Sequence, residues 1–457
     1  MTIRRLLCAF SIAAGLAGLT APLRAEVIDV PSFGKVTIER PQDTPSSVAI
    51  LLSDTGGWST EESAIAVKLA QQGTLVIGVE SSHLIDGHAG QKSCLYPAGQ
   101  LQTLAQSVEK KEGLGTYFEP AVTGIGLGAS LAYVALAEAP QNTFAGGAAL
   151  RFDPARTFAV RFCKGEHLPH MDDGQGAKTL GQADALQAPF AFIVPQSDEA
   201  RFTAFTDSME NSLVSPVADE ALASDPAAAM LAALQQAGAA AATPPAAADT
   251  SEVADFPITE VRDDQATEGD TLAIFLSGDG GWASLDDGVS EVLAAKGIPV
   301  VGVSSLKYFW QARTPDDVGR DISTIAAYYL KAWNKKHILL VGYSFGADAM
   351  PFVATRLAGP VKDSLSGLAL IGPSHAATFE FHVSGWLIDD TSGTPTLPEV
   401  KKLAGLPIAC IYGSDETDSL CNDLSGRNVS FYKANGSHHL DGDYEGAATA
   451  IVALTRT

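Results

Sequence analysis

An internal duplication constrains the fold of this chain more than any other sequence feature. The segment VAILLSDTGGWS (48–59) recurs as LAIFLSGDGGWA (272–283). Three further pairs of segments match in the same order: 71–82 with 294–305, 123–130 with 341–348, and 188–199 with 405–416. In each half, short apolar and β-branched runs alternate with helix-like stretches, which is typical of a parallel sheet covered by helices. The sequence therefore predicts two related α/β domains in tandem.

The length of 457 residues also favours two domains, because a single hydrophobic core rarely grows this large. We expect a signal peptide over 1–25, a first domain over 26–210 and a second domain over 258–457. Residues 211–257 are rich in alanine, proline and acids, a composition expected of a linker. Part of this linker, after Asp225 and Pro226, could form a helix.

The N-terminal segment has the composition of an export signal. Arg4 and Arg5 precede an apolar run that reaches Ala25, so cleavage before Glu26 is expected. A retained membrane anchor is the alternative, but glycines and Pro22 interrupt the run. The prediction is a periplasmic protein. Its net charge of −23 argues against nucleic acid as a partner and tolerates cationic ligands.

Four cysteines remain beyond the leader, two in each half. An oxidising compartment permits disulfides, and four cysteines allow three pairings. The even split favours one disulfide per domain, Cys94 with Cys163 and Cys410 with Cys421. No C-x-x-C spacing typical of a metal site is present, and neither a metal nor a cofactor is expected.

A candidate nucleophile lies in the second half. The strand-like run HILLVGY ends in Gly342-Tyr343-Ser344-Phe345-Gly346, and a helix-like stretch follows. This is the context of a nucleophile elbow, in which a sharp turn between two glycines exposes the serine hydroxyl. Ser344 is therefore the expected nucleophile.

The base and the acid should follow it in the chain, with the histidine last. His438 near the C-terminus is preferred as the base, with His439 beside it as the alternative. The loop after the strand-like run IACIYG carries three competing acids. Asp418 is the first choice because it lies farther along the loop, Asp415 is the second and Glu416 the third. His375 and His382 are expected to have surface or core roles.

Backbone amides must stabilise the oxyanion of an acyl-transfer reaction. Phe345 follows the nucleophile and supplies one amide, and either Gly280 or Asp279, in the glycine-rich loop after the strand TLAIFL, supplies the second. The first half has Gly126 where Ser344 stands, and no histidine follows its own Ser197-Asp198-Glu199 before the linker. The fold class predicted is thus two tandem α/β-hydrolase-like domains, the first degenerate and serving in binding, docking or scaffolding.

Taken together, the leader, the degenerate first half and the motifs SGDGGW, GYSFGAD, YGSDETDSLC and GSHHLDGDYEGAA resemble the AcvB/VirJ family of bacterial virulence proteins. The resemblance extends over the whole mature chain and is to the longer, two-domain members. It implies a periplasmic serine esterase that removes lysine from lysyl-phosphatidylglycerol, with an aminoacylated phospholipid at the membrane surface as its partner. It also implies an association with type IV secretion, so a secretion accessory that binds proteins, or a general periplasmic esterase, are the alternatives.

A site selective for an aminoacyl ester should place carboxylates near the oxyanion hole to receive the protonated amine. The candidates are Asp279, Asp348, Asp389 and Asp390, although each could instead be solvated or cap a helix. Apolar loop residues would approach the lipid, and Tyr308, Phe309, Trp310 and Trp386 are the candidates for this contact.

Overall fold

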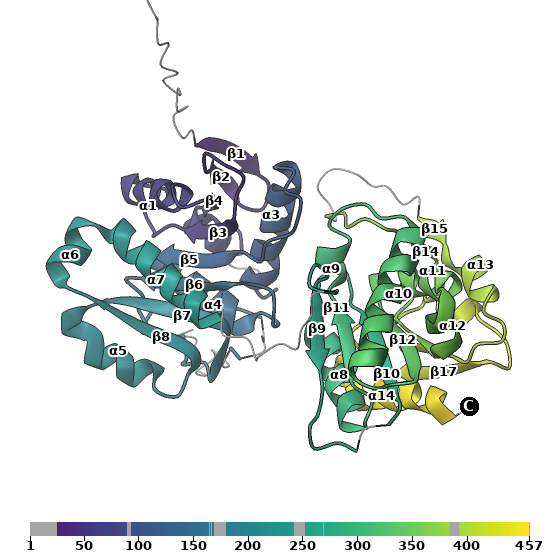
Figure 1. Ribbon diagram of the computed structural model, residues 1–457. Coiled ribbons are helices and arrows are strands. Elements are labelled where there is room, and N and C mark those ends of the chain that lie inside the picture. The colour runs from purple at the N-terminus through teal and green to yellow at the C-terminus, as the bar shows by residue number, and fades with distance from the viewer. Residues whose placement is uncertain are drawn as a thin grey trace, which may run out of the picture.

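The computed structural model describes residues 25–88, 93–163, 165, 167–168, 180–241, 252–267, 269–383 and 393–456. They form two α/β domains that follow one another in the chain, as the purple-to-teal and green-to-yellow halves of Figure 1 show. The expected signal peptide lies outside the described residues except for its last residue. Among the described residues, no helix is long and apolar enough to cross a membrane.

The first domain has an eight-stranded sheet with the order β1-β2-β4-β3-β5-β6-β7-β8. β1 and β2 are antiparallel to their neighbours, and the other strands are parallel. The strands are β1 (Glu26–Val30), β2 (Gly34–Glu39), β3 (Ser47–Leu52), β4 (Thr74–Val79), β5 (Ala121–Ile125), β6 (Gly146–Leu150), β7 (Ala185–Pro195) and β8 (Glu210–Val217). The helices are α1 (Thr60–Ala70), α2 (Ser81–Asp86), α3 (Pro97–Lys111), α4 (Leu127–Glu138), α5 (Glu199–Thr206), α6 (Asp219–Ser224) and α7 (Pro226–Ala241), with a 3₁₀ turn η1 (Gln196–Asp198).

The second domain repeats this topology without the first strand. Its main sheet has the order β9-β11-β10-β12-β13-β16-β17, with only β9 antiparallel. The strands are β9 (Ile258–Val261), β10 (Thr271–Leu276), β11 (Val300–Val303), β12 (His337–Tyr343), β13 (Leu365–Ile371), β16 (Ile408–Gly413) and β17 (Val429–Ala434), and β14 (Ala376–Ala377) pairs separately with β15 (Thr394–Pro395). The helices are α8 (Ser284–Ala295), α9 (Ser305–Tyr308), α10 (Pro315–Ala332), α11 (Phe345–Arg356), α12 (Gly359–Ser364), α13 (Thr396–Lys401) and α14 (Tyr444–Val452), with 3₁₀ turns η2 (Leu420–Asp423), η3 (Leu440–Gly442) and η4 (Ala453–Arg456).

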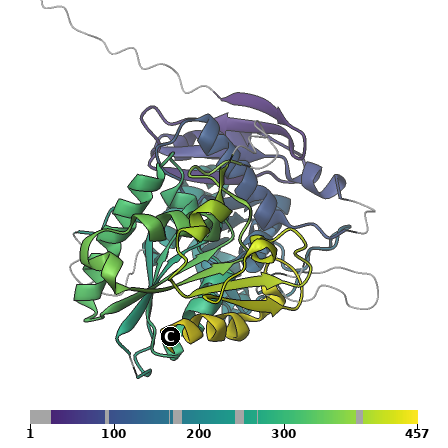
Figure 2. The same ribbon diagram turned by 90° about the vertical axis from the view of Figure 1, so that its right-hand side faces the viewer.

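Both sheets are buried on their two faces, which explains why their strands are almost continuously apolar. In β10, for example, Leu272 and Ile274 pack in one core cluster while Ala273 and Phe275 pack in the cluster on the other face. Figure 2, turned toward the second domain, shows helices on either side of its sheet. The two tandem α/β-hydrolase-like domains expected from the duplication are therefore present.

The boundary predicted between the domains differs from the structure. Residues 211–257 were expected to form a linker, but β8 extends to Val217 and α7 packs on the first sheet. The buried side chains of Met230 and Ala233 complete the core on that face. The alanine-rich composition of α7 reflects close packing of a helix on a sheet, and α7 is the counterpart of α14. The first domain therefore extends to Ala241.

The domains contact each other through loops at opposite ends of their strands. Leu114 and Tyr117 lie before β5, and each contacts Trp310, which follows α9 in the second domain. Lys307 of α9 forms an ion pair with Glu119, with 2.8 Å between Nζ and Oε1. The first domain therefore covers part of the surface at the C-terminal end of β11. The candidate active site lies at this same end of the parallel strands.

Candidate active site

Ser344 lies in a sharp turn between β12 and α11. Its φ and ψ are 51° and −118°, a left-handed conformation that costs free energy for any residue other than glycine. The glycines on either side are required by close packing. A Cβ on Gly342 would lie 2.4 Å from the carbonyl oxygen of Gly346, and one on Gly346 would lie 2.2 Å from that of Leu276. The strained turn leaves Ser344 half-buried at the start of α11, as a nucleophile elbow does.

His438 lies beside this turn and is paired with an acid. Its Nδ1 is 2.5 Å from Oε1 of Glu416, and the other carboxylate oxygen accepts a 2.7 Å hydrogen bond from the Gly413 amide. The imidazole packs over Gly372, where a Cβ would lie 2.6 Å from its Cε1. Ile371, the residue before Gly372, accepts a hydrogen bond from the Ser344 amide. With Nδ1 engaged by the carboxylate, Nε2 is the nitrogen left to act on a hydroxyl.

The choice of acid made from the sequence is therefore corrected. Asp418, the first choice, has a side chain that is 98% exposed. Its carboxylate lies 3.7 Å from Nδ1 of His375, whereas His438 is paired with Glu416. Asp415 accepts a hydrogen bond from the Ser414 hydroxyl. Glu416, ranked third, comes soon after β16 and its longer side chain spans the distance to His438. Position along the loop was a poor guide because the loop turns back after Glu416 and directs Asp418 toward solvent.

The other histidines have separate partners. Nδ1 of His439 is 2.8 Å from the Tyr343 hydroxyl. Nε2 of His375 is 2.9 Å from a carboxylate oxygen of Asp423, and His382 is exposed. Of these histidines, His438 is the one paired with Glu416 of the loop after β16, and its ring also lies 5.2 Å from that of Tyr343, the residue before Ser344.

Both disulfides expected from the cysteine split are formed, with S–S distances of 2.00 Å for Cys94–Cys163 and 2.07 Å for Cys410–Cys421. The second joins β16 to η2 and so closes the loop that carries Glu416. A covalent closure of this kind removes alternative conformations of the loop in the unfolded chain.

The two sources of oxyanion donors also lie near the serine. Phe345 is the first residue of α11, and its amide is at the helix N-terminus. In the glycine-rich loop, the Gly281 amide donates to the Gly278 carbonyl, while Asp279 and Gly280 are exposed. A Cβ on Gly278 would lie 3.7 Å from Cβ of Ser344. Gly278 is therefore the member of this loop beside the nucleophile, a position that the glycine-rich motif alone does not mark.

A second acid, Asp348, lies one helical turn after Ser344. Its carboxylate accepts hydrogen bonds of 2.6 Å from both the amide and the hydroxyl of Ser374. Burial raises the pKa of Asp348 to about 7, although the hydrogen bonds from Ser374 and the nearby His438 and His375 act in the opposite direction. This carboxyl group therefore changes charge near neutral pH.

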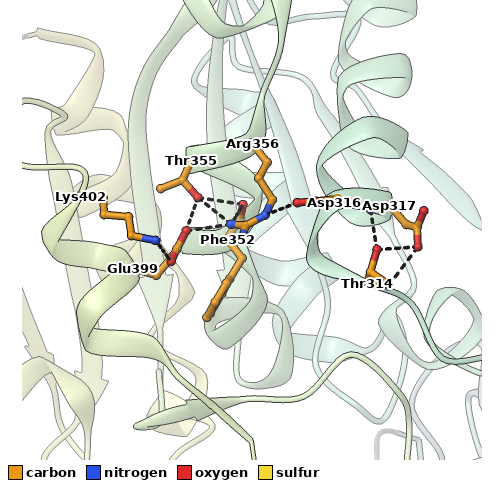
Figure 3. A network of polar contacts seen from close by, with 8 residues as sticks. All are labelled: Thr314, Asp316, Asp317, Phe352, Thr355, Arg356, Glu399 and Lys402. Atoms are coloured by element: carbon orange, nitrogen blue, oxygen red, sulfur yellow. Dashed lines mark hydrogen bonds and ion pairs between the residues drawn. The ribbon is translucent and has the colours of Figure 1, made fainter.

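The far end of α11 is fixed by a polar network (Figure 3). Arg356 donates to Asp316 at the start of α10 (2.7 Å) and to Glu399 on α13 (2.8 Å). Burial raises the pKa of Glu399, but hydrogen bonds from Lys402, Thr355 and Arg356 outweigh it, so this pKa lies below its ordinary value. The helix that begins at the nucleophile is thus tied to α10 and α13 at its other end.

The residues proposed for lipid contact do not line the surface. Tyr308, Phe309 and Trp310 are at most 2% exposed. The rings of Tyr308 and Phe309 pack against each other, and Trp310 packs against Tyr117 of the first domain. Trp386, Asp389 and Asp390 lie outside the described residues. Within the described ranges, no cluster of three or more histidine, cysteine or acidic side chains is arranged to hold a metal ion.

The sheet order, the elbow and the histidine after the last strand place the second domain in the α/β-hydrolase class. Residues 270–457 match the family model described as bacterial virulence protein (VirJ). The resemblance inferred from the motifs is therefore confirmed over this range. No curated protein sequence matches the chain.

Solved structures also match part of the chain. Est1E from Butyrivibrio proteoclasticus is 14% identical with a TM-score of 0.33, covering 44% of this chain and 94% of its own. XC6422 from Xanthomonas campestris, described as an a/b serine hydrolase without lid, is 16% identical with a TM-score of 0.30, covering 44% and 87%. The proline iminopeptidase of Mycobacterium smegmatis is 16% identical with a TM-score of 0.32, covering 44% and 94%.

Proposed function

We propose that the second domain is a serine esterase of the periplasm and that it cleaves the aminoacyl ester of lysyl-phosphatidylglycerol. The observation that carries the proposal is the arrangement of Ser344 in a strained elbow with His438 beside it, engaged at Nδ1 by Glu416. A serine hydroxyl is a weak nucleophile until a positioned base removes its proton, and an acid on the far nitrogen fixes the base in the required tautomer.

The reaction follows from these roles. Oγ of Ser344 attacks the ester carbonyl while Nε2 of His438 takes the proton, and the Phe345 amide with the Gly278–Gly280 loop faces the oxyanion that forms. Collapse of the tetrahedral intermediate breaks the bond to the glycerol oxygen, which leaves with the proton from His438 as phosphatidylglycerol. Water, activated by the same histidine, then releases lysine from the acyl-enzyme.

The choice of substrate rests on the family resemblance and on the charge of the site. A lysyl ester carries two protonated amines, which carboxylates close to the nucleophile would attract. Asp348 is half-buried one turn after Ser344 and within electrostatic range of His438. The lysyl group of lysyl-phosphatidylglycerol is cationic, and the acidic site therefore complements the charge of this substrate.

The test uses the purified mature chain and vesicles that contain lysyl-phosphatidylglycerol. We expect release of lysine and formation of phosphatidylglycerol, and Ser344→Ala should lower this turnover by at least about a thousandfold, as loss of a triad serine does in other hydrolases. A serine-directed phosphonate should label Ser344 in the wild type.

Three other outcomes would change the assignment. Turnover retained in Ser344→Ala would exclude this nucleophile. Rapid cleavage of p-nitrophenyl esters without action on the lysyl lipid would favour a general esterase. Absence of both labelling and esterase activity would favour a secretion accessory that binds proteins through a hydrolase scaffold.

A further inference from the structure

A tryptophan of the catalytic domain makes several contacts with the first domain. Trp310 follows α9 and is 1% exposed. Its Nε1 donates a 2.8 Å hydrogen bond to the Leu114 carbonyl, and its own carbonyl accepts a 2.5 Å hydrogen bond from Nζ of Lys110. The same ammonium lies 4.7 Å from the centre of a Trp310 ring. Two groups of the first domain, the Leu114 carbonyl and the Lys110 ammonium, thus make three contacts with Trp310.

The contact continues into two loops of the second domain, one after α9 and one after β14. The ring of Phe381 stacks on Trp310 at 5.6 Å, and its amide donates a 2.7 Å hydrogen bond to the Phe309 carbonyl. The ring of Phe309 lies 5.0 Å from that of Phe345, the residue whose amide is the expected oxyanion donor. Residues 309–310 follow β11 and residues 379–381 follow β13, so the cluster joins two active-site loops to the start of α11.

The position of the first domain fits a supporting role. Its contact residues lie at the end of α3 and before β5 and β6, and they meet loops that follow β10, β11 and β13. Asn142, before β6, donates from Nδ2 to the Trp282 carbonyl at the end of the glycine-rich loop (3.4 Å). Figure 1 shows α3 and α9 on the facing sides of the two domains. The first domain therefore reaches the glycine-rich loop through Trp282, and it reaches Phe345 through Trp310 and Phe309.

We propose that the first domain positions the catalytic centre, and that Lys110 and Trp310 are positioning residues which act through Phe309 on Phe345. This proposal rests on the proposed function, because it assigns the oxyanion amide of an esterase. It gives the degenerate domain a task that needs no nucleophile. Phe309 and Trp310 then fix the position of the Phe345 amide and do not contact the lipid.

The test compares two neighbouring lysines of α3 in the full chain. Lys110→Met keeps the aliphatic stem but removes the ammonium that holds Trp310. Lys111→Met makes the same change at a residue whose ammonium lies 3.6 Å from Glu26, within the first domain. Trp310→Phe is the second variant, since it keeps an aromatic ring and loses the hydrogen bond to Leu114.

The measurements are kcat and KM for the lysyl lipid, the rate of phosphonate labelling per active site, and the melting temperature. A small misplacement of a reacting group is costly, so we expect kcat and labelling rate to fall about three- to tenfold in Lys110→Met and Trp310→Phe, with little change in KM. Lys111→Met should match the wild type. Counting active sites by labelling stoichiometry separates slower chemistry from a smaller folded fraction.

Two results would overturn the positioning role. One is equal kcat per active site in Lys110→Met and Lys111→Met. The other is a lower melting temperature in both Lys110→Met and Trp310→Phe with unchanged chemistry in the folded fraction, which would make the contact purely structural. Failure of the proposed function is a distinct outcome, because it would show as activity retained in Ser344→Ala or as no action of the wild type on the lysyl lipid. In the second case the rates of phosphonate labelling still test the positioning role.

Discussion

The two domains have the same elbow but different occupants. Gly126 in the first domain has φ and ψ of 55° and −106°, close to the 51° and −118° of Ser344. A Cβ on Gly126 would lie 2.2 Å from Oδ1 of Asp54, which occupies the place of Gly278 in the repeated motif. The same oxygen accepts hydrogen bonds from the amides of Leu127 (3.0 Å) and Thr55 (2.7 Å). In the first domain, an internal carboxylate thus binds the amide that corresponds to the expected oxyanion donor Phe345.

The position of the histidine is also filled differently. Gly372 of the second domain leaves room for His438, whereas Arg151 stands at the corresponding end of β6 with the same φ of 57°. Arg151 forms a bidentate pair with Glu61, with distances of 2.9 and 2.6 Å. Where the second domain has a serine and a histidine, the first domain therefore has charged side chains that are already hydrogen-bonded within the domain. Three further experiments probe the difference between the domains.

The largest effect is expected at the acid that only the second domain uses. Glu416→Gln leaves the shape of the site intact but favours the wrong tautomer of His438, so kcat should fall by about a hundred- to ten-thousandfold. Asp418→Asn, a change of the same kind two residues later, should leave kcat near the wild-type value because that side chain is 98% exposed. Steady-state kinetics of both variants decide the assignment, and the reverse order of effects would restore Asp418 as the acid.

This pair of residues also marks the limit of what the sequence could predict. The duplication, the alternation of strands and helices, the elbow and the histidine loop are local patterns, and they located both sheets, Ser344 and His438. The acid depends on how the loop after β16 turns in space, which no periodicity records. The importance of Gly278 could have been found by comparing the repeats, since Asp54 replaces it where Gly126 replaces Ser344.

The domain boundary shows a second limit. Composition alone made residues 211–257 resemble a linker, because α7 is built largely from alanine. The correspondence between α7 and α14 appears only in the structure, where each helix packs on the sheet of its own domain. The burial of Trp310 is not predictable from its own half of the sequence for a similar reason, since its partners Leu114 and Tyr117 belong to the other domain.

An intermediate effect is expected at Asp348, whose counterpart in the first domain is Ser130. Because burial raises the pKa of Asp348 to about 7, its carboxylate is charged mainly above neutral pH. The ratio of lysyl-lipid to neutral-ester turnover in the wild type should therefore rise between about pH 6 and 8. In Asp348→Asn this ratio should fall about tenfold at pH 8, the value of one lost charge-assisted contact, and lose its pH dependence. Asp418→Asn, at a position that is 98% exposed, is the control. An unchanged ratio in Asp348→Asn would remove Asp348 from substrate recognition.

The last effect is on stability and leaves turnover unchanged, and it contrasts the ends of α4 and α11. Arg356 on α11 binds the Asp316 side chain at the start of α10 (2.7 Å), whereas Glu138 on α4 accepts from the Ala98 amide at the start of α3 (2.7 Å). Burial raises the pKa of Glu138 to about 9, only partly offset by that hydrogen bond. Between the ordinary pKa of a glutamate and about 9, the unfolded chain has lost a proton that the folded chain keeps. The free energy of unfolding should therefore fall as pH rises through this window, by up to about 1.4 kcal/mol per pH unit.

Glu138→Gln tests this because its amide can still accept from Ala98 and cannot ionise. The wild-type melting temperature should fall between pH 6 and 8 more steeply than that of Glu138→Gln, and the variant should be at least as stable as the wild type at pH 8. Glu199→Gln, at an exposed position of the same domain, is the control and should keep the wild-type slope. Parallel pH profiles for all three proteins would mean that Glu138 is ionised in the fold. The first domain would then hold a buried charge at the position where the second domain holds the Arg356 network.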